Sequence, residues 1–183
     1  MNNNQRIIFM GSPLIAREYL QTLINNKFNV IAVYTKPPQP QGRGMVLQNS
    51  SVHQEAIKQD IPVQFPKDFK EQKTINTFNN LKADLVIVMA YGKLLPLEIL
   101  NTPSYGCINI HVSLLPRWRG AAPVEYALLN GDKQSGVSIF RLVSELDAGP
   151  IFSPMKHKLH LTKPQQRYQK GSQSSLQHLF KIT

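Results

Sequence analysis

Apolar residues in the first part of the chain occur in short runs, and between them lies a segment of helical spacing. The runs at residues 6–10 and 30–35 are typical of strands, and leucines and isoleucines at helical spacing occupy residues 14–23. The turn between the first run and this segment is Gly11-Ser12-Pro13. We expect its serine to cap a helix whose first helical residue is the proline. The pattern predicts a strand–helix–strand start.

The same alternation continues to about residue 143. Residues 84–90, "DLVIVMA", are nearly all apolar and predict a central strand buried on both faces, whereas residues 36–51 lack periodicity and predict a surface loop or lid. The other expected elements are helices at 52–58, 70–81 and 124–129, a short helix ending near residue 100, and strands at 62–65, 107–112 and 137–143. Strands alternating with helices predict an α/β fold with a doubly wound, mainly parallel sheet.

Composition restricts the class of protein. The chain has 183 residues, of which 42% are hydrophobic and 17% charged, a balance typical of a globular domain. No apolar run approaches the roughly 20 residues that cross a bilayer, and the first residues do not resemble a secretory signal. Cys107 is the only cysteine, which excludes an intramolecular disulfide and a cysteine-based metal site. We expect a cytoplasmic protein with no membrane partner and no metal.

The net charge of +10 is unevenly distributed. Residues 1–155 hold 15 Lys or Arg and 11 Asp or Glu, whereas residues 156–183 hold six Lys or Arg and no acid. Most of the excess therefore belongs to a tail rich in Gln, Ser and Lys, and the charge alone does not indicate nucleic-acid binding. We expect a folded domain over residues 1–155 and a poorly ordered basic tail over residues 156–183.

The stretch "NIHVSLLPRWRGAAP" carries the candidate chemistry. Asn109 and His111 are two residues apart on an expected strand and share one face, where an amide can stabilise an oxyanion and an imidazole can donate or transfer a proton. In a parallel sheet, the loop after a neighbouring strand can supply a carboxylate that orients the imidazole, and Asp147 is the candidate. A core histidine and a turn-forming aspartate are the alternatives, and spacing alone leaves both open.

Two basic loops are candidate anion sites. Arg117 and Arg119 flank Trp118, which suits a phosphate or a nucleic-acid end, although a surface tryptophan with solvated arginines is an equal alternative. Arg43 lies between glycines in "QGRGM" and can close over an anion. The Gly11-Ser12-Pro13 turn lacks the glycine pattern of a nucleotide site and is interpreted as structural.

Five stretches together resemble a known family. "FMGSP", "YTKPPQPQGRGM", "VMAYGKLLP", "CINIHVSLLPRWRGAAPVEYALLNGD" and "ELDAGPI" resemble, in order, the formyltransferase domain of the methionyl-tRNA formyltransferases, over residues 5–155. The Asn-x-His-x-Ser-Leu-Leu-Pro pattern is shared by all folate-dependent formyltransferases, and the two basic loops are more particular to the tRNA branch. The resemblance implies a Rossmann-like fold. It also implies transfer of a formyl group from 10-formyltetrahydrofolate to the α-amino group of methionine on initiator tRNA.

The resemblance also implies residue roles. Asn109 and His111 would stabilise an oxyanion, while Asp147 would orient His111 and help to move the amine's proton through water. The wall of the formyl site would consist of Ser113, Leu114, Leu115 and Pro116. The pterin pocket would be lined, mostly through backbone groups, by Met89, Ala90, Tyr91, Gly92 and residues 142–147, which begin with Leu142. The acceptor stem of the tRNA would be bound by Arg43, Arg117 and Arg119.

The sequence departs from this family after "GPIF". The family continues into amphipathic helices, a linker and a β-barrel domain, none of which is recognisable here, so we interpret the chain as a truncated, monomeric member. One alternative is an inactive remnant that keeps folate or RNA binding. Another is a formyltransferase for a small amine, against which the two basic loops argue because they suit a polyanion better.

Overall fold

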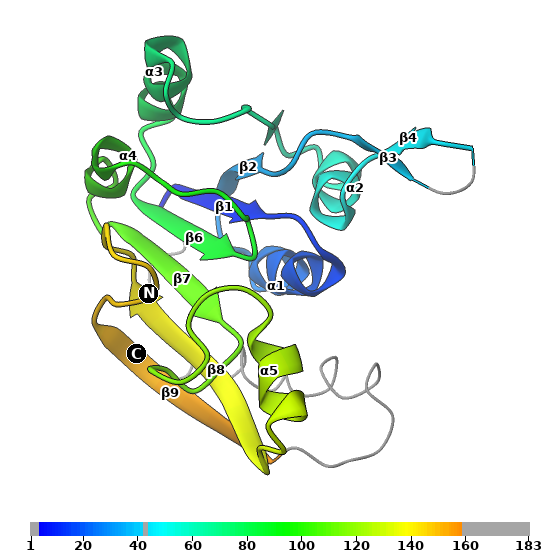
Figure 1. Cartoon of the computed structure of the whole chain (residues 1–183). Helices are drawn as coiled ribbons and strands as arrows, with labels where there is room; N and C mark the ends of the chain where they lie inside the picture. Colours follow the sequence, from blue (N-terminus) through cyan, green and yellow to red (C-terminus); the bar gives the residue numbers. More distant parts are fainter. Residues whose placement is uncertain (1–3, 42–43, 159–183) are drawn as a thin grey trace. The chain divides into compact units, whose positions relative to one another are not determined.

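The computed structural model describes residues 4–41 and 44–158, which fall into two compact units (Figure 1). The first unit ends at Cys107 and the second begins at Ile108. Arg43 and residues 159–183 of the expected tail lie outside the described residues. No helix in the described ranges is both long and apolar enough to cross a membrane.

A parallel sheet with the strand order β5-β2-β1-β6 forms the centre of the first unit. Its strands are β1 (Ile7–Gly11), β2 (Val30–Tyr34), β5 (Val63–Gln64) and β6 (Leu85–Met89). All five residues of β1 are buried, as are the last four of β6, which confirms the prediction of a central strand covered on both faces. A Cβ atom on Gly11 would lie 2.7 Å from the Met89 carbonyl oxygen, so the close approach of β1 to β6 requires glycine there.

Four helices accompany this sheet in two packed pairs, α1 with α2 and α3 with α4, which Figure 1 shows on opposite sides of the strands. They are α1 (Leu14–Asn25), α2 (Ser51–Lys58), α3 (Gln72–Asn80) and α4 (Leu97–Asn101). The expectation that Ser12 caps α1 is wrong, because Pro13 is the N-cap residue. The Ser12 hydroxyl instead accepts hydrogen bonds from the Lys36 backbone N–H, at 3.1 Å, and from the Thr35 hydroxyl, at 3.2 Å.

The expected loop at residues 36–51 contains an antiparallel hairpin, so that expectation is corrected. Strand β3 (Gln39–Gln41) pairs with β4 (Val46–Gln48) as a separate two-stranded sheet. Val46 and Leu47 are adjacent in sequence and both exposed, so neither face of β4 is covered. Apolar and polar residues alternate along a strand when one of its faces is buried, which explains why no strand pattern is visible in these residues.

The second unit is built on an antiparallel sheet in the order β7-β8-β9. Its elements are β7 (Cys107–His111), α5 (Pro123–Leu129), β8 (Gln134–Arg141) and β9 (Ile151–Lys158). Strand β9 was missed, and it continues three residues past the expected domain boundary at residue 155. It lies at the edge of the sheet, exposes Ile151 and Phe152 and contains Pro154. Edge strands tolerate a proline and exposed apolar residues, and both hide the alternation by which a strand is predicted. The expected boundary itself stays a prediction.

Candidate active site in the second unit

Asn109 and His111 lie on the same face of β7, as expected from their spacing. In the register with β8, Asn109 lies opposite Phe140 and His111 opposite Ser138. His111 is buried and meets the Phe140 ring edge-on, with ring centres 6.5 Å apart, whereas Asn109 is half-buried. No hydrogen bond to the Asn109 side chain is found among the described residues, so its amide is available to a ligand. One strand therefore presents an amide and an imidazole side by side.

The tautomer of His111 follows from its hydrogen bond to the loop after β7. Its Nε2 atom lies 2.7 Å from the Trp118 carbonyl oxygen. A carbonyl oxygen only accepts hydrogen bonds, so Nε2 carries the proton and donates it. In the neutral ring, Nδ1 then holds the lone pair. This nitrogen faces Asp147, whose Oδ2 is 3.9 Å away.

Asp147 is buried beside His111, as the sequence predicts, but the route of the chain differs from the expected one. Strand β8 runs antiparallel to β7, and its last residue, Arg141, pairs with Ile108. The loop after β8 therefore begins at the start of β7 and must fold back to bring Asp147 to His111. The Asp147 backbone is left-handed, with φ 47°, and its Oδ2 accepts a 2.8 Å hydrogen bond from the Gly120 N–H.

The fold-back of this loop depends on Gly149. A Cβ atom there would overlap the Arg141 carbonyl oxygen, which is rigid backbone. We expect Gly149→Ala to lower the free energy of unfolding by about 1–3 kcal/mol, as overpacking does. Urea unfolding of both proteins measures the effect. Gly44→Ala is the control, because a Cβ at Gly44 would make only an ordinary contact of 3.6 Å with Val46 Cγ2. An equal or smaller loss for Gly149→Ala would contradict the close approach.

The loop that follows His111 is attached to the sheet by serine hydroxyls. Ser138 donates to the Ser113 carbonyl oxygen at 2.8 Å and accepts from the Leu115 N–H at 3.0 Å. The Ser113 hydroxyl donates to the Arg117 carbonyl oxygen at 2.7 Å. Of the residues predicted to form a formyl-site wall, Ser113 and Leu115 are buried, Leu114 is half-buried and Pro116 is exposed. The hydroxyl of Ser113 is thus used to shape the loop.

Asp132 fixes the loop that carries Arg117 and Trp118. It was not identified from the sequence, where it is only the last residue of the stretch "CINIHVSLLPRWRGAAPVEYALLNGD". Its carboxylate accepts from Arg117 through two bonds, of 3.0 and 2.7 Å, and from Trp118 Nε1 at 2.7 Å. The Arg117 guanidinium carbon also lies 4.7 Å from the centre of the Trp118 ring, whose other aromatic neighbour, Tyr126, stacks at 5.9 Å. An acid downstream of an Arg-Trp pair was the only available sequence indication.

The hydrogen bonds from Trp118 and Arg117 hold the pKa of Asp132 below its usual range. Because this pKa is lowered in the folded state, the ionised carboxylate stabilises the fold at pH values above the pKa of an ordinary carboxyl group. This stabilisation is lost as the pH falls through the lowered pKa. We therefore expect Asp132→Asn to destabilise the chain at neutral pH and to differ less from the unchanged protein in acid. Urea unfolding at both pH values, followed by fluorescence of Trp118, the only tryptophan, measures this. A difference that persists in acid would contradict it.

The remaining predicted residues are divided between the units. Met89, Ala90, Tyr91 and Gly92 are at the end of β6 in the first unit, where Ala90 and Gly92 have left-handed backbones. Leu142 directly follows β8 in the second unit, and Arg119 is exposed on the loop after β7. Residues 4–41 and 44–158 contain no cluster of three or more His, Cys, Asp or Glu able to hold a metal. The absence of a metal stays a prediction.

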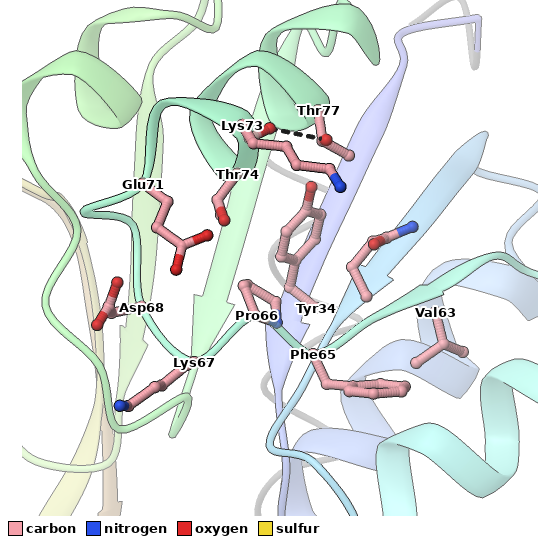
Figure 2. A pocket seen from close by; sticks show the side chains of 11 residues that line it. Tyr34, Val63, Phe65, Pro66, Lys67, Asp68, Glu71, Lys73, Thr74 and Thr77 are labelled. Carbon is pink, nitrogen blue, oxygen red and sulfur yellow. Dashed lines mark hydrogen bonds between the residues drawn. The ribbon is translucent and has the colours of Figure 1, made fainter.

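A cavity of 410 Å³ lies in the first unit, beside the ends of β2 and β5 (Figure 2). Its lining includes two lysines, Lys67 and Lys73, and two acids, Asp68 and Glu71. The Tyr34 hydroxyl is buried there without a hydrogen-bond partner in the described part of the chain, and burial raises its pKa to about 12. None of the residues predicted to carry the chemistry lines this cavity.

A family model described as formyl transferase matches residues 5–175. The chain belongs to the formyl transferase family. The methionyl-tRNA formyltransferase of Wolbachia pipientis subsp. Culex pipiens is 52% identical over 151 residues, which are 82% of this chain and 50% of that protein. The methionyl-tRNA formyltransferase of Magnetococcus marinus is 47% identical over 148 residues, which are 81% of this chain and 47% of that protein. This family member thus spans about half the length of these curated relatives.

Solved structures of other formyltransferases share the fold of this formyl transferase family member. The phosphoribosylglycinamide formyltransferase of Streptococcus pneumoniae superposes with a TM-score of 0.74 at 21% identity, covering 96% of this chain and 94% of its own. The enzyme of the same name from Bacillus halodurans gives a TM-score of 0.76 at 20% identity, and the match covers 96% of this chain and 91% of that enzyme. The predicted α/β, mainly parallel, Rossmann-like fold is confirmed.

Proposed function

We propose that the chain transfers a formyl group from 10-formyltetrahydrofolate to the α-amino group of methionine on initiator tRNA. The observation that carries this proposal is the group formed by Asn109, His111 and Asp147 on one face of the second unit. The names of the relatives, which the chain resembles over four fifths of its length, support the choice of substrates. The alternative of an inactive remnant predicts the same fold without turnover.

The reaction begins when the methionine amine attacks the formyl carbon. A carbon–nitrogen bond forms and the formyl oxygen becomes an oxyanion. The half-buried Asn109 amide is positioned on the strand face to donate to that oxygen, and a fixed donor of this kind stabilises the transition state more than the ground state. Asn109 is therefore proposed as the oxyanion donor.

His111 contributes through Nδ1, because its Nε2–H is occupied by the Trp118 carbonyl. It can donate to the oxyanion only when Nδ1 is also protonated. The Asp147 carboxylate lies 3.9 Å from the positive charge that this proton creates. The pair is thus proposed to act together, with His111 as the second donor and Asp147 as its counter-charge.

The proton on the attacking nitrogen must reach the folate nitrogen that leaves. We propose that Asp147 helps to transfer it through water, because a carboxylate can accept a proton from a bridging water and return it. When the proton arrives on the folate nitrogen, the oxyanion re-forms the formyl C=O and the bond from that nitrogen to the formyl carbon breaks. The products are formylated methionyl-tRNA and tetrahydrofolate, so atoms and charge balance.

The folate site is proposed from sequence resemblance. Residues 113–116 would form the wall beside the formyl group, and Met89, Ala90, Tyr91, Gly92 and Leu142 would line the pterin pocket through their backbones. The left-handed backbone of Ala90 supports this, because non-glycine residues in that conformation recur at ligand-binding sites. The cytoplasmic location and the monomeric state stay predictions.

Arg43, Arg117 and Arg119 are proposed to bind the tRNA, and Arg119 gives the clearest test. Arg117 is already paired with Asp132, whereas Arg119 is exposed. We expect Arg119→Ala to weaken binding of initiator tRNA and to lower the slope of log affinity against log salt by about one, with folate binding unchanged. Lys58→Ala removes an exposed charge on α2 as the control. An unchanged salt slope for Arg119→Ala would remove Arg119 from the interface.

The choice of amine is tested by comparing acceptors. We expect the full chain to formylate charged initiator tRNA with a higher kcat/KM than glycinamide ribonucleotide, at equal 10-formyltetrahydrofolate. A preference for the ribonucleotide would overturn the substrate while keeping formyl transfer. Absence of product with both acceptors, together with measurable folate binding, would favour the inactive remnant.

A further inference from the structure

We propose that Asp132 is a positioning residue for His111. Its carboxylate fixes the Arg117 and Trp118 side chains, and the loop held in this way places the Trp118 carbonyl oxygen on His111 Nε2. The imidazole is thereby kept in the Nε2–H tautomer, with its Nδ1 turned toward Asp147. The catalytic consequence rests on the formyl transfer proposed above, whereas the effect on the tautomer does not.

The anchor is made of three hydrogen bonds to one carboxylate. Arg117 donates to both oxygens of Asp132 and Trp118 Nε1 donates to one, at distances from 2.7 to 3.0 Å. Two-point pairing between a guanidinium and a carboxylate fixes orientation as well as distance. The Arg117 guanidinium also lies against the Trp118 ring, and Tyr126 stacks on that ring at an angle of 11°. The two loop side chains are therefore held in one arrangement.

The Trp118 backbone needs such an anchor. Its φ is 60°, in the left-handed region that bulky side chains rarely adopt. Gly120 and Ala122 also have left-handed backbones, with φ of 84° and 57°, so the loop is tightly coiled at this point. A backbone of this kind persists where surrounding contacts determine it, and Asp132 supplies the contacts to the Trp118 side chain.

The loop is joined to the strand end through two consecutive carbonyl oxygens. The Arg117 carbonyl accepts from the Ser113 hydroxyl and the Trp118 carbonyl accepts from His111 Nε2, each at 2.7 Å. Arg117 and Trp118 are therefore bound to Asp132 through their side chains and to Ser113 and His111 through their carbonyl oxygens. Movement of the loop would release Nε2–H, and the neutral ring could then carry its proton on Nδ1 instead. Nε2 would then have lost the contact that fixes the ring, and with it the position from which Nδ1 is proposed to donate when protonated.

The tautomer is measured by nitrogen-15 NMR of the histidine rings in the full chain, at a pH where the imidazoles are neutral. The chain has five histidines, and the spectrum of His111→Gln identifies the signal of His111. In the unchanged protein, and in the control Glu125→Ala, which changes an exposed residue of α5, we expect the Nε2–H form to predominate. In Asp132→Ala we expect a mixture of tautomers. Asp132→Asn keeps an acceptor for Trp118 Nε1 without the charge. The His111 tautomer ratio in this variant should therefore lie between those of the unchanged protein and Asp132→Ala.

The outcomes separate this inference from the proposed function. If Asp132→Ala does not fold, Asp132→Asn and Arg117→Met decide. A His111 tautomer ratio identical to that of the unchanged protein in the folded variants would overturn the positioning role. If the unchanged protein formylates tRNA, Asp132→Ala should lower kcat by up to about 10²-fold, the effect of a slightly displaced catalytic group, with KM for tRNA changed less. A tautomer shift in a chain without formyl transfer would support positioning and refute the function.

Discussion

Replacing His111 with alanine is expected to lower kcat/KM for formylation of initiator tRNA by about 10²–10⁴-fold, the range for loss of a group that donates or transfers a proton. The imidazole is buried between the Trp118 carbonyl and Asp147, so no neighbouring side chain replaces it. Initial rates with charged initiator tRNA and 10-formyltetrahydrofolate, at saturating folate, provide the measurement.

The matched control for His111→Ala is His53→Ala. His53 is equally buried, at 8% exposure against 7% for His111, but it lies in the first unit and stacks on Phe65. Its removal tests the general cost of deleting a buried imidazole, and we expect the formylation rate of the folded variant to stay near that of the unchanged protein. Equal losses of activity in both variants would show that His111 acts through stability and not in the reaction.

The second large effect is expected at Asn109. Asn109→Ala should lower kcat by about 10²–10³-fold, the cost of removing one oxyanion donor, while folate and tRNA binding change little. The reason is that the amide acts on charge present only during the reaction. Single-turnover rates with all substrates bound isolate this step.

Asn130→Ala is the control for Asn109→Ala. Asn130 lies in the same unit at the end of α5, where its amide donates to the Tyr126 carbonyl oxygen. Its loss affects the helix terminus and should leave the single-turnover rate within about threefold of normal if the two sites are independent. Retention of the normal rate by Asn109→Ala would assign oxyanion stabilisation to another donor.

Most helices and strands of the fold could be predicted because each buries a face with a regular period. Strand β6 and helix α1 are examples, since their apolar residues follow the burial pattern directly. The β3–β4 hairpin and β9 do not bury one face in this way, so hydrophobic spacing carried no information about them. Strand direction was equally hidden, because an antiparallel β7–β8 pair and a parallel one have the same alternation.

The candidate site was predictable as a set of residue types but not as a network. Asn109 and His111 share a strand face by the two-residue period alone. The 2.7 Å bond from His111 to the Trp118 carbonyl depends on a left-handed backbone that tryptophan residues rarely adopt, so the sequence could not indicate it. Asp132 was missed for the same reason, because its partners are brought to it by that loop.

The central claim is that Asn109, His111 and Asp147 of this chain transfer a formyl group to methionyl-tRNA. The most direct test mixes the full chain with 10-formyltetrahydrofolate and charged initiator tRNA, then identifies the amino acid released from the tRNA by mass spectrometry. We predict N-formylmethionine with the unchanged protein and a rate lower by about 10²-fold or more with Asp147→Asn, whose amide oxygen still accepts from the Gly120 N–H. Unformylated methionine with the unchanged protein, or equal rates for both proteins, would contradict the account.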